Sequence, residues 1–149
     1  GLLEVRVDKG LIRRPGRSSA TTDSGTIFVA MTVTLEDPQQ EDVFDVIKDV
    51  ADELGLETIR VLSPESDDVV TPRVRHELES AEFVLVDLTR RSPALYWQAG
   101  LMEGLGREPI LIARQGTVVD LDLPDCPVLY FVNLHYLRDK LKARLQQSM

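Results

Sequence analysis

The sequence predicts an α/β domain in which helices cover both faces of a five-stranded parallel sheet with strand order 2-1-3-4-5. Apolar segments of strand length alternate with amphipathic segments of helix length along the chain. The segment Phe83 to Val86 is apolar without polar alternation, as expected for a parallel strand buried on both faces. Thr71-Pro72 and Ser92-Pro93 each place a capping residue before a proline, which is typical of a helix start.

The first strand and first helix are predicted from an apolar run and an apolar stripe. Residues Thr26 to Met31 form the expected strand. The segment Gln39 to Leu54 follows, and its acidic residues fall on the solvent-facing side of the expected helix. The apolar side chains that share the opposite face are Val43, Ile47, Val50 and Leu54. Gly55 is placed to end this helix.

The second and third strand–helix units are predicted over residues 58–80 and from strand three to about Leu105. Thr58 to Leu62 is the second expected strand, and the helix that starts at Thr71-Pro72 runs to Ser80 with Val74 and Leu78 inward. The third strand ends at Asp87. Its helix is expected from Pro93 to about Leu105.

The last two strands are Pro109 to Ala113 and Val128 to Val132. The final helix, Tyr136 to Leu145, places Leu137, Leu141 and Leu145 on one face. Strands that alternate with helices imply right-handed crossovers and a flavodoxin-like three-layer sandwich. Its strand order reverses between the first and third strands, which brings the loops after Met31 and Asp87 to one crevice.

The beginning of the chain differs in composition from the rest. Residues Gly10 to Ser24 are basic and rich in Gly, Ser and Thr, and Leu2 to Val7 reads as the tail of an upstream element or an added edge strand. We therefore expect residues 1–25 to be a linker or tail and residues 26–149 to be the domain. A start at Gly1 rather than Met predicts a piece of a longer, multidomain protein or a tag remnant.

Composition excludes several classes of partner. A net charge of -8 argues against binding nucleic acid or anionic membranes, which need a basic surface. No apolar run reaches the about 20 residues of a membrane-spanning helix, and a signal-peptide pattern is absent.

The only cysteine, Cys126, predicts an inert, partly buried thiol and a cytoplasmic location. His76 and His135 stand alone without metal-type spacing, so we expect surface histidines and no metal or resident cofactor.

The carboxyl end of the third strand is the predicted ligand site. Asp87 ends the strand, and the helix that opens at Ser92-Pro93 begins at the same edge of the sheet. Ligands of open α/β sheets bind at this edge, and the free amides of a helix start favour anionic groups such as phosphates.

Four motifs make the chain resemble the TIR-like and nucleoside 2-deoxyribosyltransferase-like families, which share the flavodoxin-type fold. The first two are the "FVAM" run that ends at Met31 and Gly55-Leu56 followed by Arg60 in the second strand. The third is the segment from Ala81 to Gly100, which matches the family pattern around Asp-Leu-Thr and an aromatic pair. The fourth is the closing family pattern of the type "Gly-Arg-x-Pro-Ile-x-Leu-Ile", which the segment Gly106 to Ile112 resembles. The likeness spans about residues 26 to 133.

The resemblance implies a pocket for a nucleotide or nucleoside such as NAD+. It implies that Asp87 contacts the sugar or orients a neighbour, that the loop with Met31 and Thr32 receives the base, and that Arg60 lies near the pocket. The remaining residues that the motif places there are Thr89, Ser92, Tyr96, Trp97 and Gln98. The family's catalytic Glu, which attacks or stabilises the anomeric carbon, corresponds to Gln98.

The chain departs from the family pattern inside this motif. Ser92 and Ala94 stand where many members have Asn, and Gln98 replaces the Glu. Cleavage of an N-glycosidic bond passes through an oxocarbenium-like state that an anion stabilises by several kcal/mol. A neutral amide supplies no such charge and no basicity, although it hydrogen-bonds to a ribose diol. Glu103 lies about 140° around the helix from position 98, too far to replace the Glu.

Two functions remain open at this point. One is an NAD+ glycohydrolase or a nucleoside deoxyribosyltransferase or hydrolase, made inactive by Gln98. The other is a degenerate nucleotide-sensing or self-association module that works with other domains of a longer chain. An engineered exchange also explains Gln98, although the changes at Ser92 and Ala94 favour natural drift.

Several site residues have a structural alternative. Asp87 caps the following turn or contacts a ligand, and Arg60 faces solvent or contacts a phosphate. For Tyr96 and Trp97, core packing is favoured over base stacking for at least one of the two.

Overall fold

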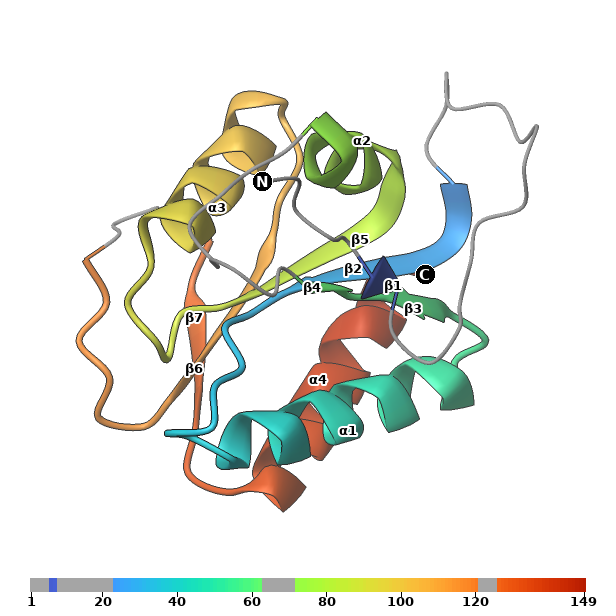
Figure 1. Ribbon diagram of the computed structural model, residues 1–149. Helices are drawn as coiled ribbons and strands as arrows, with labels where there is room; N and C mark the ends of the chain where they lie inside the picture. Colours follow the sequence, from blue (N-terminus) through green and yellow to red (C-terminus); the bar gives the residue numbers. More distant parts are fainter. Residues whose placement is uncertain (1–5, 8–22, 63–71, 121–125) are drawn as a thin grey trace.

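A five-stranded, all-parallel sheet forms the centre of the protein (Figure 1). The computed structural model describes residues 6–7, 23–62, 72–120 and 126–149. The strands, in spatial order, are β3 (Glu57–Ile59), β2 (Asp23–Ala30), β5 (Ala81–Asp87), β6 (Ile110–Arg114) and β7 (Val128–Phe131). The predicted fold class and the order 2-1-3-4-5 are confirmed. The predicted cap at Thr71 lies outside the described residues.

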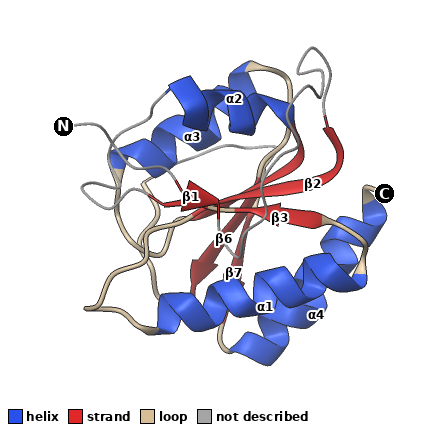
Figure 2. Ribbon diagram, turned by 45° about the vertical axis from the view of Figure 1, so that its right-hand side comes forward, coloured by secondary structure: helices blue, strands red, loops and turns tan. Residues whose placement is uncertain are grey.

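Two helices cover each face of the sheet (Figure 2). On one face lie α1 (Gln39–Glu53) and α4 (Leu134–Gln147), and on the other lie α2 (Pro72–Ser80) and α3 (Pro93–Gly104). The leucines predicted to point inward from the last helix, Leu137, Leu141 and Leu145, are fully buried. This three-layer arrangement follows from amphipathic helices that bury their apolar stripes on a sheet with two apolar faces.

Strand β5 shows why the predicted apolar run must be central. Its side chains alternate between the two cores: Leu85 packs into the α1/α4 core, whereas Val84 and Val86 pack into the α2/α3 core. All three are at most 3% exposed. Each such burial stabilises the fold by about 1.5–3 kcal/mol. An edge position would have left one backbone side of this apolar strand unpaired.

The predicted strand Thr58 to Leu62 is divided in two. Strand β3 pairs with β2 only as far as Ile59, and β4 (Val61–Leu62) pairs antiparallel with β1 (Arg6–Val7) in a separate two-stranded sheet. The N-terminal segment thus contributes strand β1, which pairs with β4. The first strand of the main sheet begins at Asp23 rather than at Thr26.

Arg60 lies at the division, and the prediction that it faces solvent is wrong. The residue is only 4% exposed. Its guanidinium carbon lies 3.8 Å from the centre of the Phe44 ring, and Nη2 lies 3.3 Å from Oε1 of Glu41 in the first turn of α1. A cation that stacks on an aromatic ring and pairs with a carboxylate can be buried, which a strand pattern alone does not reveal.

Helices α1 and α3 end as the sequence predicts. Gly55 and Gly106 adopt positive φ angles of 75° and 73°, which side chains with a Cβ rarely adopt. The amide of Leu56 donates to the carbonyl of Ala51 at 2.8 Å, and that of Arg107 donates to Met102 at 2.9 Å. These six-residue closures are the Schellman motif, which satisfies the last helical carbonyls.

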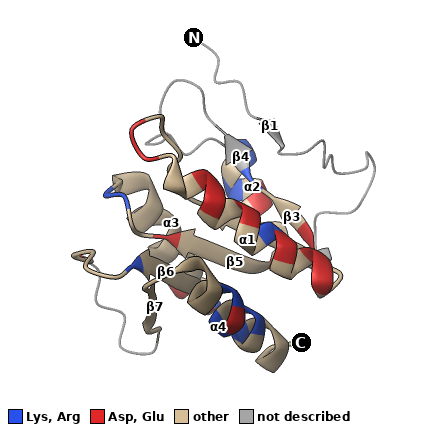
Figure 3. Cartoon of the chain, turned by 90° about the horizontal axis from the view of Figure 1, so that it is seen from below, with Lys and Arg blue, Asp and Glu red and all other residues tan. Residues whose placement is uncertain are grey.

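Acidic positions follow one another along α1 and basic positions along the neighbouring α4 (Figure 3), and ion pairs join the two helices. Arg138 contacts Asp49 and Glu53, and Lys142 contacts Glu53 at 3.1 Å. The carboxylates of α1 therefore face the cations of α4. Exposed ion pairs contribute about 0–1 kcal/mol each, so the buried leucines dominate this interface.

Arg107 connects the end of α2 with the start of β5. Its Nη1 donates to the carbonyls of Leu78 at 3.3 Å and Glu79 at 3.0 Å. Its Nη2 donates to the carbonyls of Ala81 and Glu82. Burial lowers the pKa of this guanidinium from its ordinary value. One side chain thus satisfies carbonyls that the short connection between α2 and β5 would leave without partners.

We expect Arg107→Ala to lower the free energy of unfolding by about 2 kcal/mol, because several carbonyls lose a charged donor at once. Arg75→Ala is the control, since Arg75 is exposed on α2 and pairs only with Glu79 among the described residues. It should change stability by less than about 0.5 kcal/mol. Urea unfolding followed by circular dichroism measures both. Equal effects of the two substitutions would contradict the assigned role of Arg107.

Candidate functional site

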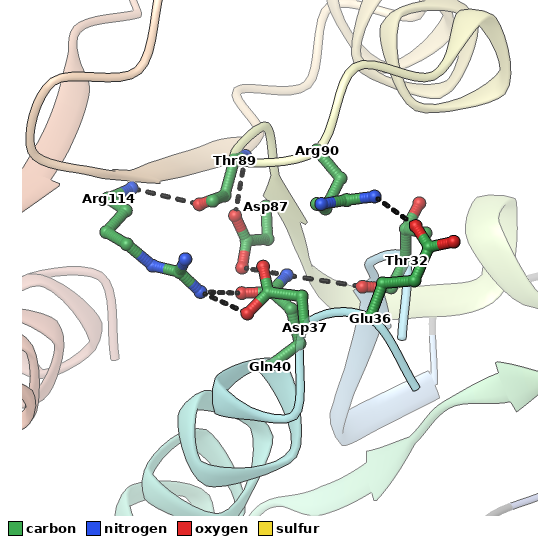
Figure 4. A network of polar contacts seen from close by, with 8 residues as sticks. All are labelled: Thr32, Glu36, Asp37, Gln40, Asp87, Thr89, Arg90 and Arg114. Carbon is green, nitrogen blue, oxygen red and sulfur yellow. Dashed lines mark hydrogen bonds and ion pairs between the residues drawn. The ribbon is translucent and has the colours of Figure 1, made fainter. Parts of the chain in front are cut away.

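The ends of β2, β5 and β6 meet the start of α1 at the carboxyl edge of the sheet (Figure 4). Thr32 follows β2, Asp87 ends β5, Arg114 ends β6, and Gln40 lies in the first turn of α1. Hydrogen bonds join these four residues into one network. The strand order places the loops of strands one and three side by side here, as the sequence predicts.

The Asp87 carboxylate is the centre of this network. The side chain is fully buried. Its Oδ1 accepts a hydrogen bond from the amide of Thr89 at 2.8 Å, and its Oδ2 accepts one from Nε2 of Gln40 at 3.1 Å. Asp87 therefore fixes the turn that follows it, which is the structural role considered from the sequence. Both of its oxygens are already bonded to the protein.

Gln40 and Arg114 extend the network to the neighbouring loops. Nε2 of Gln40 also donates to the carbonyl of Thr32 at 3.3 Å, while its Oε1 accepts from Nη2 of Arg114 at 3.0 Å. The same Nη2 lies 3.2 Å from Oδ1 of Asp37. The backbone amide of Arg114 donates to Oγ1 of Thr89 at 2.9 Å. The amide of Gln40 thus uses both its donor and its acceptor to connect three loops.

Burial raises the pKa of the Asp87 carboxyl above its ordinary value of 3.8. Loss of hydration is the largest cause, because it disfavours the charged form. Hydrogen bonds from Thr89 and Gln40 and the positive charge of Arg114 act in the opposite direction. They do not outweigh the loss of hydration.

Two ion pairs join the loops outside this network. Nη2 of Arg90 lies 3.6 Å from Oε2 of Glu36, which connects the β5–α3 turn to the loop after β2. Arg91 pairs with Asp120, whose backbone amide donates to the Tyr96 hydroxyl at 3.2 Å. The turn before α3 is therefore tied to both neighbouring loops by exposed, exchangeable contacts.

Gln98 lies on the buried face of α3 with Leu95, Ala99 and Met102. It is 7% exposed, and its buried Oε1 has no hydrogen-bond partner among the residues that the structure describes. Leaving such an acceptor unsatisfied costs about 1–3 kcal/mol. Gln98 lies in the second turn of α3, and this helix begins at the carboxyl edge of the sheet.

Several buried polar atoms lack a hydrogen-bond partner among the described residues. Three of them belong to residues at this edge of the sheet: Oγ1 of Thr32, Oγ1 of Thr34 and Nε of Arg114. They come from the loop after β2 and the end of β6, and Oε1 of Gln98 is a further such atom on α3. Donors and acceptors that the protein leaves unpaired are suited to bind a polar ligand.

The structure divides the predicted site residues into two groups. Thr32, Thr89 and Asp87 belong to the network around Gln40, and Met31 is buried in the adjoining α1/α4 core. The other group lies on or at the start of α3: Ser92, Tyr96, Trp97 and Gln98. No hydrogen bond joins Gln98 to Asp87, which instead bonds to α1 on the other face of the sheet.

The two aromatic residues of the motif differ in environment. Tyr96 packs against the α2/α3 core, so core packing is confirmed for one of the pair. Trp97 is 44% exposed, which leaves part of its ring available for contacts. Arg60 is directed to Glu41 and Phe44 of α1, as described above.

Cys126 was expected to be partly buried and is buried, at 4% exposure, and its Sγ lies 2.9 Å from the carbonyl oxygen of Pro109. Burial, with Glu108 and Glu103 nearby, raises the pKa of this thiol to about 11. A thiol protonated at neutral pH is a poor nucleophile. His76 and His135 are exposed. Among the residues that the structure describes, no group of His, Cys, Asp and Glu is arranged to hold a metal ion, and no helix could cross a membrane.

Sequence reasoning missed Gln40 and Arg114. Both carried a signal: Gln40 falls on the same stripe of α1 as Val43 and Ile47, and Arg114 directly follows an apolar strand, as Asp87 does. A polar residue on a buried stripe needs a polar partner, and the end of β5 supplies it.

Comparison with known proteins adds no assignment: no protein family model and no curated protein matches the chain.

We predict that Asp87→Asn changes how stability depends on pH. A carboxyl with a raised pKa keeps its proton to a higher pH in the folded state than in the unfolded chain. The wild-type protein should therefore lose stability relative to Asp87→Asn as pH rises above 3.8, until the folded-state pKa is passed. Urea unfolding across a pH series measures this difference.

Asp45→Asn removes the same charge from the exposed face of α1 and serves as the control. If the stability of the wild type relative to Asp87→Asn stays constant or increases as pH rises above 3.8, the raised pKa of Asp87 is contradicted.

Proposed function

We propose that this domain binds a nucleotide or nucleoside at the carboxyl edge of β2 and β5 without cleaving its N-glycosidic bond. The observation that carries the proposal is Gln98: a buried amide with an unpaired oxygen at the position where the TIR-like and deoxyribosyltransferase-like resemblance places a catalytic Glu.

The unpaired atoms near this edge support a polar, hydroxyl-rich ligand. The Gln98 amide can both donate to and accept from a ribose diol, and the hydroxyl of Thr32 has no hydrogen-bond partner within the described part of the chain. The half-exposed ring of Trp97 on α3 offers an apolar surface for a base or sugar. Asp87 acts as a positioning residue, because its carboxylate holds the loops and is already bonded.

The absence of a negative charge at position 98 supports binding without turnover. Departure of the base leaves positive charge on the anomeric carbon, and a neutral amide does not stabilise that charge. The buried carboxylate of Asp87 is engaged by Thr89 and Gln40. Binding geometry is thus kept while the chemical step lacks its anion.

Base release and binding should be measured with the same ligands: NAD+, ADP-ribose, deoxynucleosides and nucleoside monophosphates. We expect calorimetry to detect binding of at least one of them and chromatography to detect no base release by the wild-type chain. Gln98→Glu should raise base release at least about tenfold, because it restores an anion near the anomeric carbon. Recovery stays partial, since Ser92 and Ala94 also differ from the family pattern.

Gln146→Glu adds the same charge on an exposed part of α4 and should leave base release unchanged. Robust cleavage by the wild-type chain would show that another residue supplies the charge. Failure of every ligand to bind either the wild type or Gln98→Glu would refute the proposed function.

A further inference from the structure

Strand β7 is an edge strand with a free backbone side. Among the described residues only β6 pairs with it. The carbonyl of Phe131 accepts from the amide of Gln115 on the β6 side at 2.9 Å, so the alternating backbone directs the N–H and C=O groups of Tyr130 to the open side. The segment Val128 to Val132 contains no charge and no proline, the features that usually protect an edge.

A groove of about 610 Å³ runs between this edge and α4. Its lining includes Tyr130 of β7 and a stripe of α4 formed by Tyr136, Lys140, Ala143 and Arg144. Tyr130 and Tyr136 are each 39% exposed, and Val132, two residues after Tyr130 on the same strand edge, is 66% exposed. Aromatic and aliphatic surface thus adjoins an unpaired strand edge.

The charged side chains of the groove are both cationic, although the chain carries a net charge of -8. Nζ of Lys140 lies 5.5 Å from the centre of the Tyr136 ring and forms no ion pair with a described residue. Arg144 forms an ion pair with Glu108, in which Nη2 lies 3.5 Å from Oε1, and its Nη1 donates a hydrogen bond to Oγ of Ser148. The groove therefore favours a partner with carboxylates.

We propose that this groove binds an extended acidic peptide segment, which adds to the sheet as a strand beside β7. Backbone hydrogen bonds to Tyr130 would hold the peptide. Its alternate apolar side chains would contact Tyr130 and Val132 on one face of the sheet, and the carboxylates on the opposite face would pair with Lys140 and Arg144 of α4. A second copy of the chain fits less well. Edge-to-edge pairing of two β7 strands supplies no carboxylate, because the segment Val128 to Val132 is uncharged.

Fluorescence anisotropy with labelled peptides tests this proposal on the full chain. The probe is a short peptide of alternating Val and Glu. The comparison peptides carry Lys in place of Glu, or a central Pro that prevents strand pairing. We expect saturable binding of the acidic peptide, weaker binding at high salt, and at least about tenfold weaker binding of both comparison peptides.

Variants locate the binding to the groove. Tyr130→Pro removes the outward N–H without touching the hydrogen bonds to β6, and should weaken binding about tenfold. Lys140→Gln should weaken it about two- to fivefold. Lys142→Gln removes a charge from the α1 side of the same helix and should have no effect. Circular dichroism verifies folding, and Lys140→Gln stays decisive if Tyr130→Pro does not fold.

Three results would overturn the proposal. One is the absence of saturable binding of the acidic peptide at millimolar concentration. Another is equal binding of the acidic and basic peptides. The third is a dimer in analytical ultracentrifugation that Lys140→Gln leaves intact and Tyr130→Pro disrupts, which would assign the edge to a second copy.

Discussion

The carboxyl edge of the sheet depends on the buried hydrogen bonds of one carboxylate. Asp87 accepts from the Thr89 amide and from Gln40, and Gln40 in turn bonds to the carbonyl of Thr32 and to Arg114. The loops after β2, β5 and β6 are therefore positioned by one polar network, in addition to the apolar packing of Val33 and Leu88 against the two cores. Removing a single partner leaves buried donors or acceptors unpaired, which costs far more than an exposed hydrogen bond contributes.

This network also limits what the site can do chemically. A carboxylate that holds three loops is not free to act on a ligand, and its raised pKa reflects burial rather than a nearby reaction partner. Among the buried side chains of the motif from Ala81 to Gly100, Gln98 has an oxygen without a hydrogen-bond partner in the described part of the chain. An amide recognises hydroxyl groups without stabilising a developing cation, so the geometry supports recognition better than catalysis.

Most of the fold could be predicted from the sequence because its signals are local. The apolar run of β5, the leucine stripe of α4 and the glycines after α1 and α3 each determine one element through its own periodicity or backbone conformation. The strand order followed from the alternation of strands and helices. The division of the second strand could not be predicted, because it depends on a distant partner, β1.

The candidate site could be predicted only in outline. The position of Asp87 follows from the end of an apolar strand, but its bond to Gln40 joins residues that are 47 positions apart. Arg60 was misjudged for the same reason, since its burial depends on Phe44 and Glu41 of another element. Pairing between distant polar side chains leaves little trace in a single sequence.

The most direct test of ligand binding without cleavage is a crystal structure of the wild-type chain with the tightest-binding nucleotide of the calorimetric series. We predict an intact ligand at the carboxyl edge of β2 and β5. A ribose hydroxyl should lie within hydrogen-bond distance of the Gln98 amide, and the Asp87–Gln40 bond should remain. A cleaved ligand at this edge, or an intact one bound elsewhere with Gln98 unengaged, would contradict the account.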